Sequence, residues 1–219
     1  MDLGISGKWA LVCGASKGLG LGCARALVQE GVNVLMVARG TEALQAAAAQ
    51  LIDSFASQNG AIVQWLATDI TTEAGRAAVL AQRAEFDIVV TNAGGPPTGD
   101  FRNFERDDWI RALDANMLTP IALIKATVDG MAAKGVTINN LLPCAFDTER
   151  LQSIFQGAAA KTAQPVDTVA AARRNTIPAK RFGSIDEFGA ICAFLCSQQA
   201  GYMTGQNVLA DGGAYPGTF

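Results

Sequence analysis

The sequence contains no histidine, and this absence excludes several kinds of site. Without an imidazole, the chain cannot form a Ser-His-Asp or Cys-His catalytic group or a His-ligated metal or haem site. Charged residues make up only 17% of the chain, and their formal net charge is −3, with a pI near 5.0. Because nucleic-acid binding needs a basic face, we expect no nucleic-acid partner, and we expect no metal site.

Paired cysteines and long apolar runs are also missing. The five cysteines stand at 13, 23, 144, 192 and 196 and include no C-x-x-C pair, so a disulfide framework is not expected. No apolar run reaches the ~18 residues that a membrane helix needs. Residues 1–4, Met-Asp-Leu-Gly, lack the basic start of a signal peptide. These features predict a cytoplasmic protein with no membrane partner.

Half of the residues are hydrophobic, which is enough for a substantial core, and they alternate between strand and helix patterns. Short apolar runs predict strands at 8–13, 32–37, 61–66, 87–91, 136–142 and 207–210. Helical spacing or capping predicts helices at about 19–30, 41–56, 71–83, 107–133 (bent near Pro120) and 185–197, with two short helices in 147–180. The alternation predicts one α/β domain over 1–219, a Rossmann-type doubly wound parallel sheet with helices on both faces.

A glycine-rich turn joins the first predicted strand to the first helix. It reads Gly14-Ala15-Ser16-Lys17-Gly18-Leu19-Gly20. Glycines allow a sharp turn and let a phosphate approach the backbone, while the helix start behind them offers free N–H groups and the positive end of a dipole. A glycine-rich turn also occurs for purely structural reasons, so both interpretations stay open on this motif alone.

Further blocks resemble one family. The spacing G-x-x-x-G-x-G at 14–20 is followed by Asp69-Ile70, Thr91-Asn92-Ala93-Gly94 and Leu113-Asp114-Ala115-Asn116. Pro143 to Thr148, Tyr202 to Gln206 and Asp211-Gly212-Gly213 complete the order. Together these blocks resemble the short-chain dehydrogenase/reductase family, of the classical, 3-oxoacyl reductase-like type, over nearly the whole chain.

The resemblance implies roles for the matching positions. Gly14, Gly18, Leu19 and Gly20 belong to the loop that holds the pyrophosphate, and Asp69 and Ile70 would flank the adenine. Asn92, Ala93 and Gly94 would line the cofactor cleft, and Pro143 to Thr148 would run beside the nicotinamide, with Thr148 near its carboxamide. Asn116 would be the one catalytic residue present, in a kinked helix. For Asp69 a role at the start of a helix, and for Asn116 a bond to its own helix backbone, remain alternatives.

Charge indicates which cofactor binds. An NAD enzyme usually has an acidic residue at the end of the second strand, which bonds the ribose 2′-hydroxyl. Here the stretch reads Val37-Ala38-Arg39. Arg39 could pair with a 2′-phosphate, and Ser16 and Lys17 could add a hydroxyl and a second cation. We therefore predict NADP(H) as the cofactor, although Arg39 and Lys17 could instead be solvated surface charges.

The family's Ser and Tyr-x-x-x-Lys are absent. The only tyrosines, Tyr202 and Tyr215, have Gln206 and Phe219 four residues later. In the family, one strand and one helix carry these residues, and here the chain passes from the long helix to the later strand near 131–136. The gap amounts to roughly 30 to 45 residues. It is either a true deletion, in which the later strand could dock beside the fourth, or an omitted segment; we favour omission because a deletion removes an apolar helix face.

Two functions follow from these observations. The resemblance implies an NADP(H)-dependent oxidoreductase that transfers a hydride between nicotinamide and a small carbonyl or secondary alcohol substrate, provided that the missing segment exists. The alternative is a catalytically inactive NADP(H)-binding sensor or interaction protein. The resemblance also implies a homo-oligomer, either a dimer or a tetramer. We expect 95–100 and 146–180 to border the substrate.

Overall fold

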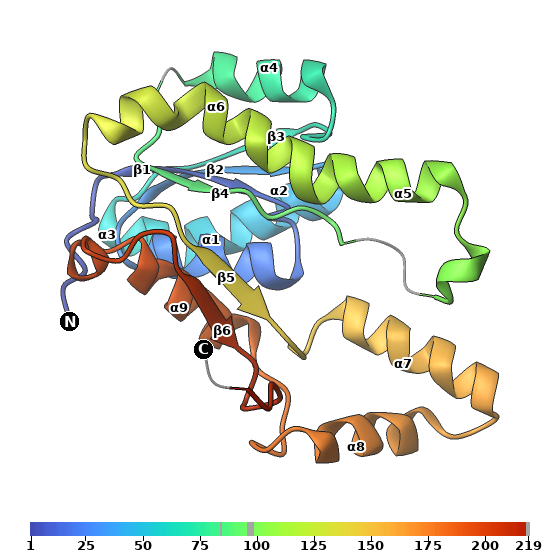
Figure 1. The fold of residues 1–219 in the computed structure, drawn as a ribbon. Helices are drawn as coiled ribbons and strands as arrows, with labels where there is room; N and C mark the ends of the chain where they lie inside the picture. The colour runs from blue at the N-terminus through green and yellow to red at the C-terminus, as the bar shows by residue number, and fades with distance from the viewer. Residues whose placement is uncertain (84, 96–98, 218–219) are drawn as a thin grey trace.

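The computed structural model describes residues 1–83, 85–95 and 99–217 of the chain (Figure 1). Its strands are β1 (Trp9–Cys13), β2 (Asn33–Ala38), β3 (Val63–Ala67), β4 (Ile88–Val90), β5 (Asn140–Pro143) and β6 (Asn207–Ala210). The longer helices are α1 (Gly18–Gln29), α2 (Thr41–Leu51), α4 (Glu73–Gln82), α5 (Arg106–Leu113), α6 (Thr119–Ala132), α7 (Glu149–Thr162), α8 (Val166–Thr176) and α9 (Ile185–Leu195). Shorter turns are η1 (Ile52–Ala56), α3 (Ser57–Asn59), η2 (Phe101–Asn103), η3 (Asp114–Leu118) and η4 (Gln198–Ala200). None of the helices in the described ranges is both long and apolar enough to cross a membrane.

Four strands form a parallel main sheet in the order β3-β2-β1-β4. The central strands are apolar because helices cover both of their faces, so the predicted Rossmann-type fold is confirmed (Figure 1). The two faces are unequally filled. The core against α1, α2 and α9 contains 22 buried residues, whereas the core against α4 and α6 contains eight. The α4–α6 side is therefore the thinner layer of the fold.

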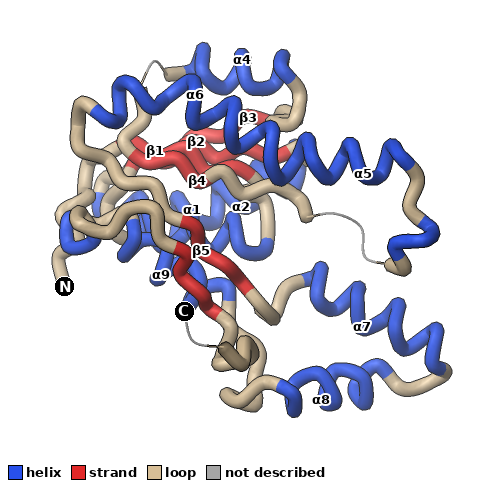
Figure 2. The backbone as a smooth tube through the Cα atoms, viewed as in Figure 1, coloured by secondary structure: helices blue, strands red, loops and turns tan. Residues whose placement is uncertain are grey.

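Strands β5 and β6 form a separate two-stranded parallel sheet, the small sheet (Figure 2). The expectation that the later strand could dock beside the fourth is therefore wrong: β5 pairs with β6 and not with β4. The strand predicted at 136–142 is also shorter than expected, since pairing is limited to Asn140–Pro143. The ladder between β5 and β6 is short because β6 has only four residues.

Helix α9 holds the small sheet in place by packing against α1. A Cβ atom at Gly189 would overlap the carbonyl oxygen of Gly22, and a Cβ at Gly22 would overlap that of Ile185. The two glycines thus let the helix backbones approach closely. Leu141 of β5 packs against the same core, and Phe146 stacks edge-on against Phe188 of α9 at 5.2 Å between ring centroids. Moving β5 next to β4 would pull these groups away from α9.

The long helix predicted for 107–133 changes its geometry close to Pro120, as predicted. The change in helix geometry is a π-helical turn, η3, between α5 and α6. Leu118 and Thr119 both keep helical backbone angles, so Pro120 lies within a continuous helical run. There it has no N–H to donate to a carbonyl of the preceding turn, which favours a change of helix geometry at this place. A second π-helical turn, η1, ends the alanine-rich helix predicted for 41–56.

Helix α6 connects to β5 by a tight turn. The N–H of Gly135 donates to Ala132 O at 3.0 Å, and that of Val136 donates to Met131 O at 3.2 Å. These bonds close the turn without the strand–helix unit that the family pattern places here. The chain thereby joins α6 directly to β5, whereas the family pattern places a further strand and helix between these two elements.

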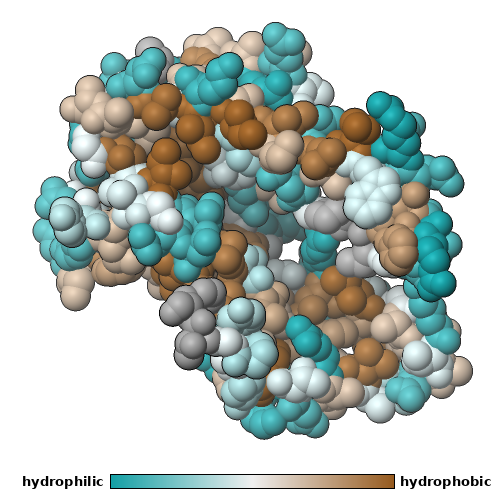
Figure 3. Space-filling view, viewed as in Figure 1, coloured by the Kyte–Doolittle hydropathy of each residue, from teal (hydrophilic) through white to brown (hydrophobic). Residues whose placement is uncertain are grey.

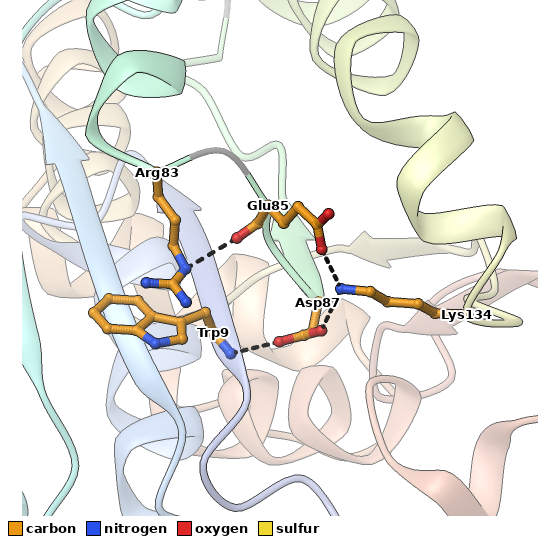
Figure 4. Close-up of polar contacts among 5 residues, drawn as sticks. All are labelled: Trp9, Arg83, Glu85, Asp87 and Lys134. Carbon is orange, nitrogen blue, oxygen red and sulfur yellow. Dashed lines mark hydrogen bonds and ion pairs between the residues drawn. The ribbon is translucent and has the colours of Figure 1, made fainter.

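Lys134 in this turn is tied to the amino end of β4 (Figure 4). Its Nζ lies 2.8 Å from Glu85 Oε2 and 3.2 Å from Asp87 Oδ1, and the other Asp87 oxygen accepts the Trp9 N–H at 2.9 Å. Burial raises the pKa of Asp87, but the Trp9 N–H and the Lys134 ammonium outweigh it and hold this pKa below its ordinary value. Arg83 lies over the Trp9 ring, 4.1 Å from its centroid. The cluster fixes the turn against the main sheet.

Replacing Gly189 by alanine tests the close approach of α1 and α9. Because the new methyl group would meet backbone rather than a flexible side chain, we expect Gly189→Ala to lower the free energy of unfolding by about 1–3 kcal/mol. Gly157→Ala on α7 is the matched control, because a methyl group there would meet no other atom within 4 Å and alanine favours helix. Urea unfolding measures both variants. Equal stabilities for the two would show that the helices do not depend on the glycine contact.

Replacing Lys134 by methionine tests the ionic tie between the turn and β4. We expect a lower unfolding midpoint at pH 7 for Lys134→Met, and no change for Lys125→Met, whose exposed side chain has no ion pair among the described residues. Because the folded-state pKa of Asp87 is lowered, its contribution is complete above about pH 4 and is lost as the pH falls through the folded value. Thermal unfolding from pH 3 to 8 should therefore show the difference fading at acidic pH. A difference independent of pH would contradict an ionic contribution.

Candidate functional site

The predicted cofactor residues follow strand ends at one edge of the main sheet. Gly14 follows β1, Arg39 follows β2, Asp69 comes soon after β3, and Asn92 follows β4. Because the four strands are parallel, their carboxyl ends meet at this edge, which is where open α/β sheets bind ligands. The fold therefore brings these residues, which are far apart in the sequence, to one side of the sheet.

Within the glycine-rich turn, side chains are sterically excluded at two positions. A Cβ at Gly20 would overlap the carbonyl oxygen of Gly14, and Gly14 itself adopts φ +64° against the Asn92 amide. Gly18 also has a positive φ, +57°, and its α-carbon faces the Thr148 methyl group. The backbone at this turn is thus uncovered by side chains of its own, as close contact with a phosphate requires.

The start of α1 lacks the usual partners for its first N–H groups. Lys17 at the N-cap position makes no side-chain capping bond, and the first turn contains no acidic residue. By contrast, Thr72, Thr148 and Ser184 cap α4, α7 and α9 through their hydroxyl groups. An uncapped helix start with a positive dipole end suits an anion such as a pyrophosphate.

The turn lies beside the end of β2. The Ala15 N–H donates to Val37 O at 3.1 Å, which sets Ser16 and Lys17 next to the Ala38–Arg39 stretch. Arg39 is exposed, and its charge acts on Asp69. Burial raises the pKa of Asp69, but hydrogen bonds from the Thr71 hydroxyl and N–H, together with Arg39, leave it below its ordinary value.

Asp69 and Asn92 both make local bonds that shape the edge. The Asp69 carboxylate accepts the Thr71 N–H at 3.0 Å and its hydroxyl at 2.8 Å, a turn that leads into α4. Ile70 beside it is buried in the smaller core. The Asn92 amide donates to Cys13 O at 3.3 Å and joins the ends of β4 and β1. Ala93 and Gly94 continue from it along the same edge, and residues 96–98 of the predicted substrate loop lie outside the described range.

The carboxyl end of β5 reaches the same place from the small sheet. Beyond Pro143, the Thr148 hydroxyl caps α7 by accepting the Leu151 N–H at 3.3 Å. Glu149, the first residue of α7, pairs with Lys17 of the glycine-rich turn at 2.7 Å. Both side chains of this pair are largely exposed, so the bridge contributes little stability. The bridge joins the glycine-rich turn after β1 to the start of α7, which follows β5.

Two side chains at this end of β5 were not identified from the sequence. Glu149 follows Thr148 as the acidic first-turn residue of a capped helix, so the sequence could indicate that it lies at a helix start. The sequence could not indicate that its ion-pair partner is Lys17. Arg173 of α8 donates to the exposed Cys144 sulfur at 3.5 Å. Because 29 residues separate Arg173 from Cys144, the sequence did not indicate that a cation lies near this sulfur.

Asn116 lies within η3, and its side-chain amide donates to Ala112 O at 2.9 Å. This bond, within its own helix, is the structural alternative stated from the sequence, and it coincides with the bend between α5 and α6. The side chain is exposed, on the open side of the molecule where no described element covers it. Its catalytic role stays a prediction.

Known proteins match this chain over most of its length. A family model described as short chain dehydrogenase matches residues 8–140, and one described as enoyl-(acyl carrier protein) reductase matches 131–215. The 3-oxoacyl-acyl-carrier-protein reductase of Vibrio harveyi is 26% identical over 259 aligned positions, covering 97% of this chain and 99% of the relative. Acetoacetyl-CoA reductase of Cupriavidus necator is 25% identical over 257 positions, covering 95% and 98%.

Solved structures share the fold. L-sorbose reductase from Gluconobacter frateurii, complexed with NADPH and L-sorbose, superimposes with a TM-score of 0.89 at 24% identity, covering 100% of both chains. An NAD⁺-bound xylitol dehydrogenase superimposes with a TM-score of 0.83 at 20% identity, covering 95% of this chain and 99% of the other. The chain thus shares its overall fold with these structures.

The family match spans more than half of the chain and runs through the glycine-rich turn, the strand ends and the helix that bears Asn116. The curated relatives are reductases. This chain therefore belongs to the short chain dehydrogenase family of oxidoreductase enzymes.

Proposed function

We propose that the protein is an NADP(H)-dependent oxidoreductase that transfers a hydride between the nicotinamide and a small carbonyl or secondary alcohol substrate. One observation carries this proposal: an uncapped helix start and a bare glycine turn lie beside the cation Arg39. A dinucleotide that carries an additional phosphate would have a group to bind at each of these features. Its pyrophosphate suits the helix start, and its 2′-phosphate suits the guanidinium.

The preference for NADP(H) rests on the charge at the end of β2. No acidic residue stands at the end of β2, where an NAD enzyme usually has one. Among the structures of similar fold, L-sorbose reductase was solved with NADPH, whereas the xylitol dehydrogenase was solved with NAD⁺. Because the fold accepts both cofactors, the charge at Arg39 is the discriminating feature.

The chain's own residues would bind and orient the cofactor. Gly14, Gly18 and Gly20 would leave room for the pyrophosphate, and Ser16, Lys17 and Arg39 would hold the 2′-phosphate. Leu19, Asp69 and Ile70 would border the dinucleotide, and Asn92, Ala93 and Gly94 would line the cleft. Pro143 and Thr148 would flank the nicotinamide, which supplies the hydride when it is bound.

The proton that accompanies the hydride has no evident donor in this chain. Tyr202 is fully exposed and precedes β6, so it lies at the amino edge of the small sheet, opposite to Pro143. Tyr215 follows β6 and bonds to Asp211 through its N–H, with no lysine four residues later. A missing general acid costs a rate factor of about 10²–10⁴, because the proton must then come from water.

A second candidate is a catalytically inactive NADP(H)-binding sensor or interaction protein. The direct turn from α6 to β5 favours it, because that turn stands in place of the segment expected to bear Ser and Tyr-x-x-x-Lys. Both candidates share the cofactor site and differ only in turnover. A cytoplasmic location and a homo-oligomeric state remain predictions under either candidate.

Cofactor preference is tested by titrating the protein with NADPH and NADH and following ligand fluorescence. We expect NADPH to bind at least tenfold more tightly, because the Arg39 guanidinium would face the 2′-phosphate. Arg39→Asp should reverse the preference, because the carboxylate would repel the 2′-phosphate of NADPH and accept hydrogen bonds from the ribose hydroxyls of NADH. Arg39→Lys keeps the positive charge and should retain most of the preference for NADPH. Tighter binding of NADH by the unaltered protein would contradict the proposal.

Turnover is tested by NADPH oxidation with a panel of small ketones and 3-oxoacyl thioesters, beside the Vibrio harveyi reductase as reference. For an oxidoreductase without its general acid, we expect oxidation above the buffer rate but about 10²–10⁴-fold slower than that of the reference. NADPH binding with no oxidation of any substrate would instead leave the inactive binding protein as the function.

A further inference from the structure

Two strand edges are left without partners between the two sheets. Among the described residues, β4 pairs only with β1, and β5 pairs only with β6. β4 is the last strand of the main sheet and β5 belongs to the small sheet, which lies next to it (Figure 2). Unpaired edges of this kind readily accept a further strand.

The inner edge of β5 can be assigned from its bonds to β6. The N–H groups of Asn140 and Cys144 donate to Gln206 O at 2.8 Å and Ala210 O at 3.2 Å. Since alternate residues of a strand point their backbone groups to opposite edges, Leu141 presents its N–H and C=O to the gap. Pro143 presents only its C=O there, because proline has no N–H.

One face of the small sheet is also uncovered. Leu141 packs against the α1–α9 core, so the alternation of side chains points Leu142 to the opposite face. That face of the main sheet is covered by α4 and α6, yet Leu142 is 39% exposed and nearby Ile138 is 50% exposed. A helix lying over β5 and β6 would cover both side chains.

The helices on that side expose a run of large apolar side chains, here called the α5–α6 stripe. Its members are Trp109, Ile110, Leu113, Met117, Leu118 and Ile121, each between 39% and 50% exposed. Figure 3 shows apolar side chains gathered along these helices and in the hollow toward β5. A patch of this extent marks an interaction surface on a water-soluble fold.

Relatives indicate the size of the group that fits. The alignment with the Vibrio harveyi reductase spans 259 positions, whereas this chain has 219 residues, so at least 40 aligned positions of that relative face no residue here. About 40 residues suffice for one strand, one helix and their connections.

We propose that the gap between β4 and β5 is a docking site for a strand–helix segment supplied by a separate polypeptide. An extended stretch of the segment would pair in parallel with both open edges. The amphipathic helix that follows would lay its apolar face over Leu142 and against the α5–α6 stripe. One occupant would thereby satisfy the backbone edges, the uncovered sheet face and the exposed helices together.

A second copy of this chain fits less well. Its helices could cover the α5–α6 stripe, but their backbone groups are already bonded within the helices and cannot pair with β4 or β5. Its own β5 is flanked by β6 and α9, which hold it in the small sheet. The strand–helix segment is therefore the occupant that the edges select.

The test uses the whole 219-residue chain and a synthetic peptide. The peptide is the strand–helix stretch of the Vibrio harveyi reductase that follows the counterpart of α6 and precedes the counterpart of β5. Fluorescence anisotropy should show saturable binding with one peptide per chain, and hydrogen exchange should show the Leu141 amide becoming protected on binding. Leu142→Asp should weaken binding at least tenfold by placing a charge under the helix. Ile62→Asp, at an exposed apolar position beside the far edge strand β3, is the control and should bind normally.

Several results would overturn the proposal. These are no binding, binding without protection of Leu141, or equal weakening by both substitutions. Sedimentation velocity adds a further criterion. If the protein forms a dimer that persists at saturating peptide, and if the Leu141 amide is equally protected in that dimer without peptide, the site between β4 and β5 is occupied by a second copy of the chain. None of these readouts depends on cofactor binding or turnover, so failure here leaves the proposed function untouched.

Discussion

The close packing of α1 against α9 is the contact on which the rest of this fold depends. Among the described residues, no ladder of backbone bonds joins the small sheet to the main sheet, so helix packing carries its position. Gly22 and Gly189 make the approach possible, and the Phe146–Phe188 contact ties the end of β5 to α9. The small sheet thus stays in place although the strand between the sheets is missing.

That constraint explains how a shortened chain keeps its cofactor edge. The glycine-rich turn, Arg39 and Asn92 come from the main sheet, whereas Thr148 and Glu149 arrive from the small sheet. Because α9 fixes the small sheet, Thr148 still faces Gly18, and Glu149 still reaches Lys17. The predicted binding residues therefore lie on elements that this chain has, and so does the predicted catalytic residue Asn116, whereas the Ser and Tyr-x-x-x-Lys of the family pattern are absent.

Local sequence signals predicted most of the fold. Apolar runs marked β1 and β2, and the Ser184 and Thr72 caps marked helix starts, because these features act over a few residues. The absence of a strand–helix unit near 131–136 stays a prediction from the family pattern. The sequence could not show whether β5 would move next to β4, because that outcome depends on the α1–α9 contact, whose two helices lie far apart in the sequence. The Lys17–Glu149 and Arg173–Cys144 contacts were not predicted for the same reason. Pro120, a local signal, did indicate roughly where the long helix changes its geometry, but not that the change is a π-helical turn.

Amide hydrogen exchange at two adjacent residues of the free protein tests the open gap most directly. With β5 held in the small sheet and its inner edge open, the Leu142 amide, which points toward β6, should be protected, and the Leu141 amide should exchange rapidly. Equal, strong protection at Leu141 and Leu142 in the monomeric protein would mean that β5 is paired on both edges, and would contradict a fold with an open gap between β4 and β5.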